Sequence, residues 1–221
     1  MSADITVLVP MLGRPHRVEP LLASLQTTAP DARVLFCLSP HDPGVHKEVE
    51  RLGKPYITVA WVSRGDYARK INAGYRHTST RYLFTGADDL LFHPGWWQAA
   101  LGCLQQNPHA GVVGTNDLGN PRVLRGEHAT HFLVTRDYAD KHGAIDQPGA
   151  IFHEGYLHEY VDDELVCTAK RRGAWIFCEQ SIVEHLHPDW GKAPTDRMYA
   201  QQRLRMRQGA QVFRMRRRLW T

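Results

Sequence analysis

The sequence lacks any apolar run of the roughly 20 residues that a membrane-spanning helix needs. Its amino terminus also lacks the basic-then-apolar pattern of a secretory signal. The four cysteines form no Cys-x-x-Cys pair, and Cys37, Cys167 and Cys178 sit inside apolar runs, where free buried thiols are expected. These absences argue against a disulfide-rich secreted scaffold and predict a protein of the reducing cytoplasm without a transmembrane segment.

Acidic residues are absent from the last part of the chain. Residues 197–221 hold eight arginines and no acid. Subtracting those eight from the 27 basic residues of the whole chain leaves 19, against 23 acidic residues. The body is therefore near −4 and the tail +8. We expect residues 1–196 to form one domain and residues 197–221 to form a basic, partly apolar helical tail.

The 221 residues suit a single α/β domain. β-branched and apolar runs predict strands at residues 5–10, 33–38 and 56–62, and apolar spacing predicts helices between them. Further along, residues 115–125 are rich in Gly, Asn and Pro and predict a loop, and the last strands are expected at 175–178 and 181–185. Alternating strands and helices predict a mostly parallel sheet flanked by helices.

The most informative stretch is residues 81–94, in which an apolar run ends in Asp88 and Asp89. Two adjacent carboxylates at the end of a buried strand repel each other and are costly to desolvate. A divalent cation or several backbone N–H donors would offset that cost, and open α/β sheets bind ligands at this edge. The alternative is a solvated turn in which one acid caps the next helix.

The run YLFTGADDLLFHPGWWQAAL resembles the metal-binding segment of family 2-type glycosyltransferases with the GT-A fold. In that family an acid pair follows a buried strand and precedes an apolar pair, a proline and a helix. Gly86 stands where the commonest form of the motif has its first Asp, so Asp88 and Asp89 are the matching residues. The resemblance implies that both bind the metal and that Asp88 also contacts the donor nucleotide. Other short motifs extend it from about residue 5 to residue 187, and it implies a single GT-A (Rossmann-like) domain.

The resemblance also implies donor-binding residues in two loops. The loop VPMLGR after the first strand implicates Pro10 and Arg14 in binding the nucleotide base and phosphates. Asp42, just beyond the second strand, is the candidate partner of the uracil or ribose. An ordinary strand-to-helix connection, and an Asp placed by turn chemistry, are the alternatives.

A third donor-binding segment is expected at residues 65–75, which resemble the family's loop-to-helix segment ending in Asn-x-Gly. Arg69, Lys70 and Asn72 fall in the first turns of the predicted helix. Cations beside the free N–H groups of a helix N-terminus suit a diphosphate. The same residues could also belong to a solvated amphipathic helix.

A second acidic cluster precedes a helix that ends in Arg-Arg-Gly. The resemblance implies that Asp162 is the catalytic base, with Asp163 as the alternative base and Glu164 as the second acid. Acids at a helix N-terminus are also stabilising without any catalytic role.

His185 and His187 alternate by two, so on an extended strand their imidazoles point to one side. The family often has a His here that completes the metal site, and His185 matches it best. A hydrogen-bonded structural His is the alternative. Hard oxygen ligands with an imidazole suit Mn²⁺ or Mg²⁺.

Together these motifs imply a metal-dependent inverting glycosyltransferase with a nucleotide-diphosphate sugar donor, UDP-sugar favoured. The tail suggests a polyanionic acceptor such as modified DNA ahead of lipid, because arginine suits bidentate phosphate contacts. The candidate contact residues are Arg214, Arg216, Arg217 and Arg218. A tail helix packed on the body, with its arginines paired to acids, is the alternative. A nucleotidyltransferase and a non-catalytic nucleic-acid-binding protein are the other function classes.

Overall fold

The computed structural model describes residues 4–60, 66–200 and 202–221, with the backbone alone for residues 202–204. Its strands form one eight-stranded sheet in the order β3-β2-β1-β4-β7-β6-β8-β5. Their bounds are β1 Ile5–Pro10, β2 Arg33–Leu38, β3 Tyr56–Thr58, β4 Tyr82–Thr85, β5 Leu90–Phe92, β6 Val112–Asn116, β7 Phe132–Thr135 and β8 Trp175–His185.

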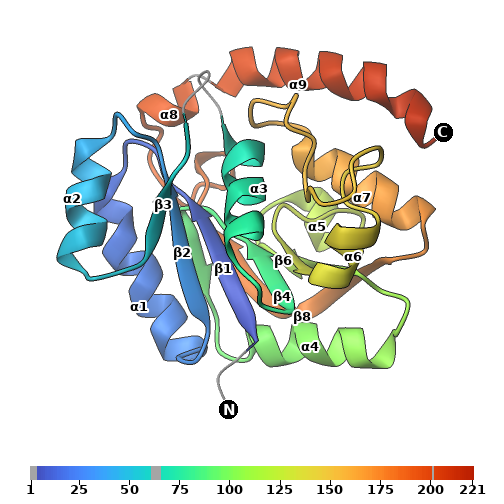
Figure 1. Ribbon diagram of the computed structural model, residues 1–221, viewed down its shortest axis with the longest axis horizontal. Helices are drawn as coiled ribbons and strands as arrows, with labels where there is room; N and C mark the ends of the chain where they lie inside the picture. The colour runs from blue at the N-terminus through green and yellow to red at the C-terminus, as the bar shows by residue number, and fades with distance from the viewer. Residues whose placement is uncertain (1–3, 61–65, 201) are drawn as a thin grey trace.

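Strand direction divides the sheet into two parts (Figure 1). β3, β2, β1 and β4 run parallel to one another, so β1, β2 and β4 all end at the same edge. In the second part β7 pairs antiparallel with β4 and β6, β6 pairs parallel with β8, and β5 pairs antiparallel with β8. The prediction of one α/β domain with a mostly parallel sheet is confirmed.

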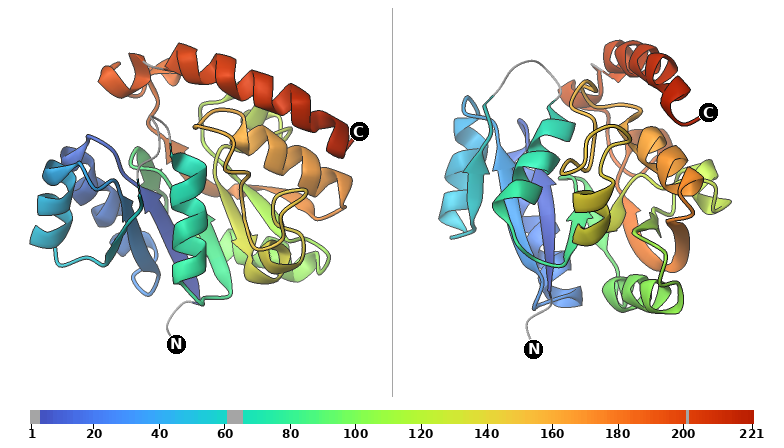
Figure 2. Two further views of the ribbon diagram at one scale, coloured as in Figure 1. Left: turned by 45° about the horizontal axis from the view of Figure 1, so that its top comes forward. Right: turned by 45° about the vertical axis from the view of Figure 1, so that its right-hand side comes forward.

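Helices cover both faces of this sheet (Figure 2). Their bounds are α1 Val18–Thr28, α2 Pro43–Arg51, α3 Tyr67–His77, α4 Trp96–Gln106, α5 Pro121–Leu124, α6 Arg136–Lys141, α7 Val161–Arg171, α8 Arg197–Ala200 and α9 Gln202–Arg216, with short 3₁₀ turns η1 Pro15–Arg17, η2 Pro188–Trp190 and η3 Arg217–Leu219. The side chains of β1 alternate between the faces. Ile5, Val7 and Val9 pack in the cluster formed with α1, α2 and α4, whereas Leu8 packs in the cluster formed with α3, α6 and α7.

Three elements differ from the sequence prediction. The strand predicted at residues 56–62 is observed only as β3, and residues 61 and 62 lie outside the described residues. The loop predicted at residues 115–125 contains the end of β6 and all of α5. The strands predicted at 175–178 and 181–185 are one strand, β8, whose register against β6 shifts where the sequence prediction had a break.

The cysteines are free thiols, but two of them meet. The Sγ atoms of Cys103 on α4 and Cys178 on β8 lie 2.7 Å apart. Burial, together with Cys103, raises the pKa of the Cys178 thiol to about 12. The contact holds α4 against the strand that ends at His185. Spacing in the sequence could not reveal it, because 75 positions separate the two residues.

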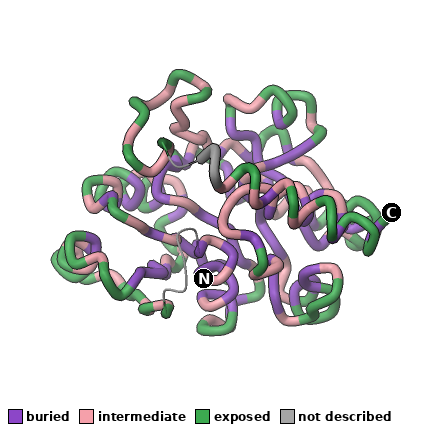
Figure 3. Tube along the Cα trace, turned by 90° about the horizontal axis from the view of Figure 1, so that it is seen from above, coloured by how far each residue is buried: buried purple, intermediate pink, exposed green. Residues whose placement is uncertain are grey.

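The C-terminal helices cross the edge at which β1 ends, and α8 and α9 lie over the rest of the fold in the view from above (Figures 1 and 3). Within the described parts of the chain, no helix combines the length and the apolar character that a bilayer span requires.

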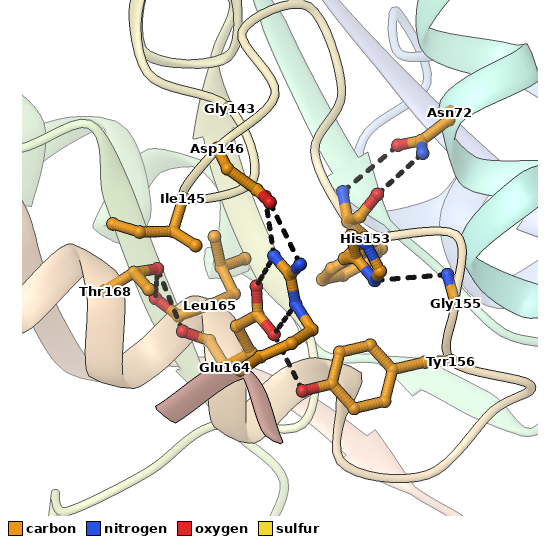
Figure 4. A network of polar contacts seen from close by, with 12 residues as sticks. Asn72, Gly143, Ile145, Asp146, His153, Gly155, Tyr156, Glu164, Leu165 and Thr168 are labelled. Carbon is orange, nitrogen blue, oxygen red and sulfur yellow. Dashed lines mark hydrogen bonds and ion pairs between the residues drawn. The ribbon is translucent and has the colours of Figure 1, made fainter. Parts of the chain in front are cut away.

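Arg216 ties α9 to the body of the protein through Asp146 and Glu164, two acids of the polar network in Figure 4. Its buried guanidinium donates to the Glu164 carboxylate at 2.7 and 2.8 Å and to Asp146 at 2.7 and 3.1 Å. Glu164 also accepts a hydrogen bond from the Tyr156 hydroxyl at 2.7 Å. The assignment of Arg216 to a phosphate contact was therefore wrong, since its donors are already used by acids of the body. Glu164 is likewise occupied as a structural partner.

We predict that Arg216→Met lowers the free energy of unfolding by about 3–5 kcal/mol, because removing one partner leaves a buried carboxylate uncompensated. Arg214→Met is the matched control on the same helix, since Arg214 is exposed. Denaturant unfolding of both variants measures the difference. Equal stability of the two variants would show that the buried ion pair does not hold the tail.

Candidate active site

A cavity of about 170 Å³ lies at the sheet edge where β1 and β4 end. Its walls come from the loop after β1, the start of α3, the segment after β4, the start of α7, the end of β8 and the C-terminal segment. The sequence-predicted residues in its wall are Pro10, Arg14, Lys70, Asp88, Asp89, Asp162 and His185. The structure therefore brings together residues that span most of the chain.

Strand pairing brings His185 to the acid pair. Asp88 and Asp89 lie three and four residues after the end of β4 and are buried, with 9% and 4% of their surface exposed. β5 starts at the next residue, Leu90, which pairs with His185 at the end of β8. The Nε2 atom of His185 consequently lies 3.4 Å from Oδ1 of Asp89. One antiparallel register thus places an imidazole beside a carboxylate that lies nearly 100 positions earlier in the sequence.

Arg14 supplies the positive charge that the acid pair requires. Its Nη1 atom lies 2.9 Å from Oδ1 of Asp88 and 3.5 Å from Oδ2 of Asp89. The other edge of the guanidinium pairs with both oxygens of Asp196, at 2.7 and 2.9 Å. The guanidinium also lies over the Tyr199 ring, 4.2 Å from its centroid, and the Tyr199 hydroxyl donates to Asp89 at 2.5 Å. The C-terminal segment therefore closes this side of the cavity.

The two carboxyl groups have opposite pKa shifts. Burial and the neighbouring charge of Asp89 raise the pKa of Asp88 to about 7, although Arg14 opposes this. Burial would also raise the pKa of Asp89, but His185 and the Tyr199 hydroxyl outweigh it and hold that pKa below its usual range. Asp89 is therefore ionised at neutral pH, whereas Asp88 titrates near it.

These residues fit a hard divalent cation. Two carboxylates and an imidazole nitrogen are ligand types that Mn²⁺ and Mg²⁺ accept. Oδ1 of Asp89 is buried and accepts no hydrogen bond of good geometry; its neighbour, Nε2 of His185 at 3.4 Å, would be the imidazole ligand of the same cation. The guanidinium of Arg14 contacts both carboxylates and supplies, in this structure, the positive charge that a bound cation would otherwise supply. A cation would take over that contact.

Close contact with β1 explains why position 86 is glycine and not the acid of the commonest motif. Its amide donates to the Leu8 carbonyl of β1 at 2.8 Å. A Cβ atom at this position would lie only 2.7 Å from the same carbonyl oxygen. Any side chain here would push β4 away from the central strand, so the close approach requires glycine.

The second acid cluster separates into two roles at the start of α7. Asp162 lines the cavity. Its Oδ2 atom accepts a hydrogen bond from Nε2 of the buried His128 at 3.1 Å. Asp163 instead accepts from Arg122 at 2.8 Å. Burial would raise the pKa of Asp162, but the hydrogen bond from His128 lowers it overall, whereas burial and Asp162 raise the pKa of Asp163. Of the two predicted bases, Asp162 is the one that reaches the cavity.

Tyr160, the residue immediately before α7, has an unusual backbone conformation. Tyr160 has φ 67°, the left-handed region that bulky residues avoid at a cost of about 1–2 kcal/mol. Packing of its ring against Phe213 of α9 accompanies this conformation. This turn places the first residues of α7 at the cavity, and Val161 and Asp162 both line it.

His128, Asp162 and Asp163 also form a group whose ligand-type atoms lie within 4.8 Å of one another. Asp88, Asp89 and His185 do not meet this spacing in the described residues, where Arg14 contacts both carboxylates. In the group of His128, Asp162 and Asp163 the ligand-type atoms already have protein partners, through the His128–Asp162 hydrogen bond and the Arg122–Asp163 ion pair. We therefore assign the better cation site to the acid pair, whose Asp89 keeps an unpartnered oxygen.

Three predicted donor-binding residues do not line the cavity. Asn72 pairs with the backbone of Phe152 on both sides of its amide, at 2.7 and 3.1 Å (Figure 4). Arg69 forms an ion pair with Glu154 at 3.5 Å. Asp42 caps α2 and accepts the amide of Gly13 at 2.5 Å, so it fixes the loop after β1. Asn72 was therefore predicted wrongly, because its face of α3 turns toward the protein interior.

Lys70 lines the cavity but is held by the protein. Its Nζ atom donates to the Met11 carbonyl and to the Ser39 hydroxyl, both at 2.7 Å, and lies 3.2 Å from Asp66. Burial lowers its pKa, which Asp66 partly offsets. Lys70 thus positions the loop after β1, and its charge is already matched by a carboxylate.

The sequence analysis did not identify several residues of the wall. Tyr199 and Arg205 come from the C-terminal segment, and His158 and Glu159 come from the loop before α7. Burial and Asp162 raise the pKa of Glu159 to about 7. Nδ1 of His131 donates to the Thr85 carbonyl at 2.8 Å, and its buried Nε2 has no hydrogen-bond partner. A second histidine three positions earlier, His128, was the sequence signal that could have indicated His131.

Comparison with known proteins identifies one family. The family model described as Glycosyl transferase family 2 matches residues 6–164. No curated protein sequence matches the chain.

Solved structures with the same fold share little sequence with this chain. A mannosyltransferase from Pyrobaculum calidifontis, solved with GDP-Man and Mn²⁺, is 18% identical with a TM-score of 0.69, and the match covers 97% of this chain and 65% of that one. A glucosyl-3-phosphoglycerate synthase from Mycobacterium tuberculosis, solved with Mn²⁺, UDP-Glc and phosphoglyceric acid, is 15% identical with a TM-score of 0.62, covering 94% and 78%. The chain thus spans about two thirds of the mannosyltransferase. At these identities the likeness establishes the fold alone.

The raised pKa of Asp88 predicts a pH-dependent stability in the absence of metal. Between about pH 4 and pH 7 the folded state keeps a proton that the unfolded state has released, so the free energy of unfolding falls as pH rises. Asp88→Asn cannot titrate. The free energy of unfolding of Asp88→Asn, minus that of wild type, should therefore rise by a few kcal/mol between pH 4 and pH 8. This follows because each unit by which folding raises the pKa of Asp88 corresponds to about 1.4 kcal/mol.

Chemical denaturation at several pH values in the presence of a chelator measures this difference. Asp31→Asn, at an exposed position, is the matched control and should follow the wild-type curve. Parallel curves for Asp88→Asn and wild type would contradict the assigned environment of Asp88.

Proposed function

The chain belongs to glycosyl transferase family 2, and from this membership we propose how its residues carry out glycosyl transfer. The donor is a nucleotide-diphosphate sugar, with a UDP-sugar favoured, and the acceptor supplies a hydroxyl group. Transfer proceeds by one displacement with inversion at the anomeric carbon. The observation that carries the proposal is the buried pair Asp88–Asp89, which meets His185 in a cavity that Asp162 also reaches.

Asp88, Asp89 and His185 are proposed to hold Mn²⁺ or Mg²⁺. Support comes from the unpartnered oxygen of Asp89 and from the metals in related structures, which hold Mn²⁺ with GDP-Man or UDP-Glc, or Mg²⁺ with UDP. The bound cation would stabilise negative charge on the departing diphosphate. Asp88 must lose its proton to bind the cation, because only the carboxylate is a ligand.

Arg14 is proposed to bind the donor diphosphate. Its planar guanidinium pairs with both oxygens of Asp196, and the same bidentate geometry suits a phosphate. A phosphate that replaced Asp196 would lie beside the acid pair. Pro10 lines the same wall and would contact the nucleotide.

The donor needs more room than the cavity offers. Sites for ligands of this size usually measure about 300–1,000 Å³, against about 170 Å³ here. Tyr199 and Arg205 form part of the wall, and Asp196 holds Arg14. We therefore propose that Asp196, Tyr199 and Arg205 move away from the cavity when the donor binds.

Asp162 is proposed to be the general base. Its Oδ2 atom is occupied by His128, which leaves Oδ1 to accept the proton of the acceptor hydroxyl. The acceptor oxygen then bonds to the anomeric carbon as the bond to the diphosphate breaks. His128 acts through Asp162 and is a positioning residue, since it is buried behind the carboxylate.

Asp163 is the less suited base, because Arg122 holds it and it does not line the cavity. Family membership also excludes the two other function classes, a nucleotidyltransferase and a non-catalytic nucleic-acid-binding protein. A screen of nucleotide sugars for metal-dependent release of nucleoside diphosphate identifies the sugar and the nucleotide of the donor.

We predict that Asp162→Asn reduces turnover by about a hundredfold or more while donor binding persists, as expected when a general base is lost. Asp163→Asn is the matched control, with the same chemical change one position along the helix, and should retain most activity. Nucleoside diphosphate release measures turnover, and calorimetry with UDP and Mn²⁺ measures binding. Loss of activity in Asp163→Asn alone would move the base to that residue.

A further inference from the structure

The helix α9 presents one fixed face to the outside. Arg216 is buried and held by Glu164 and Asp146, and the Phe213 ring packs against the Tyr160 ring of the body. Gly209 lies so close to the body that a Cβ atom there would be 2.4 Å from the Glu159 carbonyl oxygen. Three contacts spread along the helix therefore prevent it from rotating about its axis.

Arginines form a stripe along the opposite face. Arg207, Gln211 and Arg214 are exposed and are spaced by four and three residues, so they share one side of the helix. Arg217 and Arg218 extend the stripe into η3 and are also exposed. None of these four arginines takes part in an ion pair with any described residue, in contrast to Arg216. Their charge faces outward.

Large apolar side chains lie along the same segment. Met206, Met215 and Leu219 expose 40%, 59% and 45% of their surface. They account for three of the seven large hydrophobic residues exposed in the described structure. Their concentration on α9 and η3 distinguishes two anionic partners. Nucleic acid phosphates gain nothing from exposed thioethers, whereas a lipid surface buries them at the boundary between headgroups and acyl chains.

We propose that the outward face of residues 206–219, here called the α9 face, docks on an anionic membrane surface. The arginines would pair with lipid phosphates. Met206 and Met215 are nine residues apart and so lie on opposite flanks of the arginine stripe, where each would meet the headgroup layer on its own side, with Leu219 at the end of the stripe. The sequence alone favoured nucleic acid over lipid, and the exposed apolar residues on this helix reverse that order. The inference goes beyond the proposed glycosyl transfer and depends on none of the donor-site residues.

The position of α9 also determines which side of the protein would face the membrane. α9 crosses the sheet edge that carries the cavity (Figure 1), and Arg205, one residue before the α9 face, lines the cavity wall. A docked membrane would therefore lie on the cavity side of the molecule.

Vesicle co-sedimentation tests the proposal with the full chain. Wild type should bind vesicles of phosphatidylcholine with about 30% phosphatidylglycerol, should bind pure phosphatidylcholine weakly, and should be released by high salt. The triple variant Arg207→Gln/Arg214→Gln/Arg218→Gln should bind at least tenfold more weakly. The variant Met206→Ser/Met215→Ser should also lose affinity, because the apolar contribution is removed.

The matched control is Arg33→Gln/Lys47→Gln/Arg81→Gln, which removes three exposed cations elsewhere on the surface. It should bind vesicles as wild type does. Calorimetry with UDP and Mn²⁺ should give the same affinity for all four proteins, so failure of the membrane proposal is distinguishable from failure of the donor site.

Three outcomes would overturn the proposal. One is that wild type fails to bind the anionic vesicles at low salt. Another is that the control loses as much affinity as the arginine variant, since attraction would then follow net charge and not the α9 face. The third is that the methionine variant binds vesicles unchanged while the arginine variant loses binding to duplex DNA, which would make nucleic acid the partner of this face.

Discussion

Two adjacent carboxylates buried at the end of a strand must be neutralised, and much of this structure provides that neutralisation. Asp88 and Asp89 lie where β4 leaves the sheet, and their mutual repulsion is too costly to leave unmatched away from water. Arg14 approaches from the loop after β1 and His185 from the end of β8. The β5–β8 register and the glycine at position 86 are what allow these groups to meet. Carboxylates held together in this way are of the type that a divalent cation accepts as ligands.

The C-terminal segment is part of the same arrangement. Asp196 and Tyr199 engage Arg14 and Asp89, and further along Arg216 engages Glu164 in α7. The tail is thus anchored at both the metal-site candidate and the helix that carries the candidate base. Its contacts explain why the cavity is small, and why admission of a donor would involve this segment. The arginines that remain outside these contacts are those that face solvent.

Much of the fold and part of the site could be predicted from the sequence. Apolar runs and helical spacing located β1, β2, β4, α1 and α4, because the burial of a parallel sheet imposes nearly continuous hydrophobic strands. Asp88, Asp89 and His185 were predicted as metal ligands from their resemblance to the family motif, and the structure brings the three residues to one cavity. Spacing alone could not decide which face of α3 points to the cavity, so Asn72 was assigned to the donor although it binds the backbone of Phe152. Tyr199 was missed because a contact across 110 positions leaves no local pattern.

The central claim is that the acid pair with His185 holds a divalent cation together with the donor diphosphate. The most direct measurement is an anomalous difference map from crystals grown with Mn²⁺ and UDP. A single manganese peak within bonding distance of Asp89 and His185, with Arg14 displaced from the acid pair, is the predicted result. A peak among His128, Asp162 and Asp163, or no peak while UDP is bound, would contradict the account.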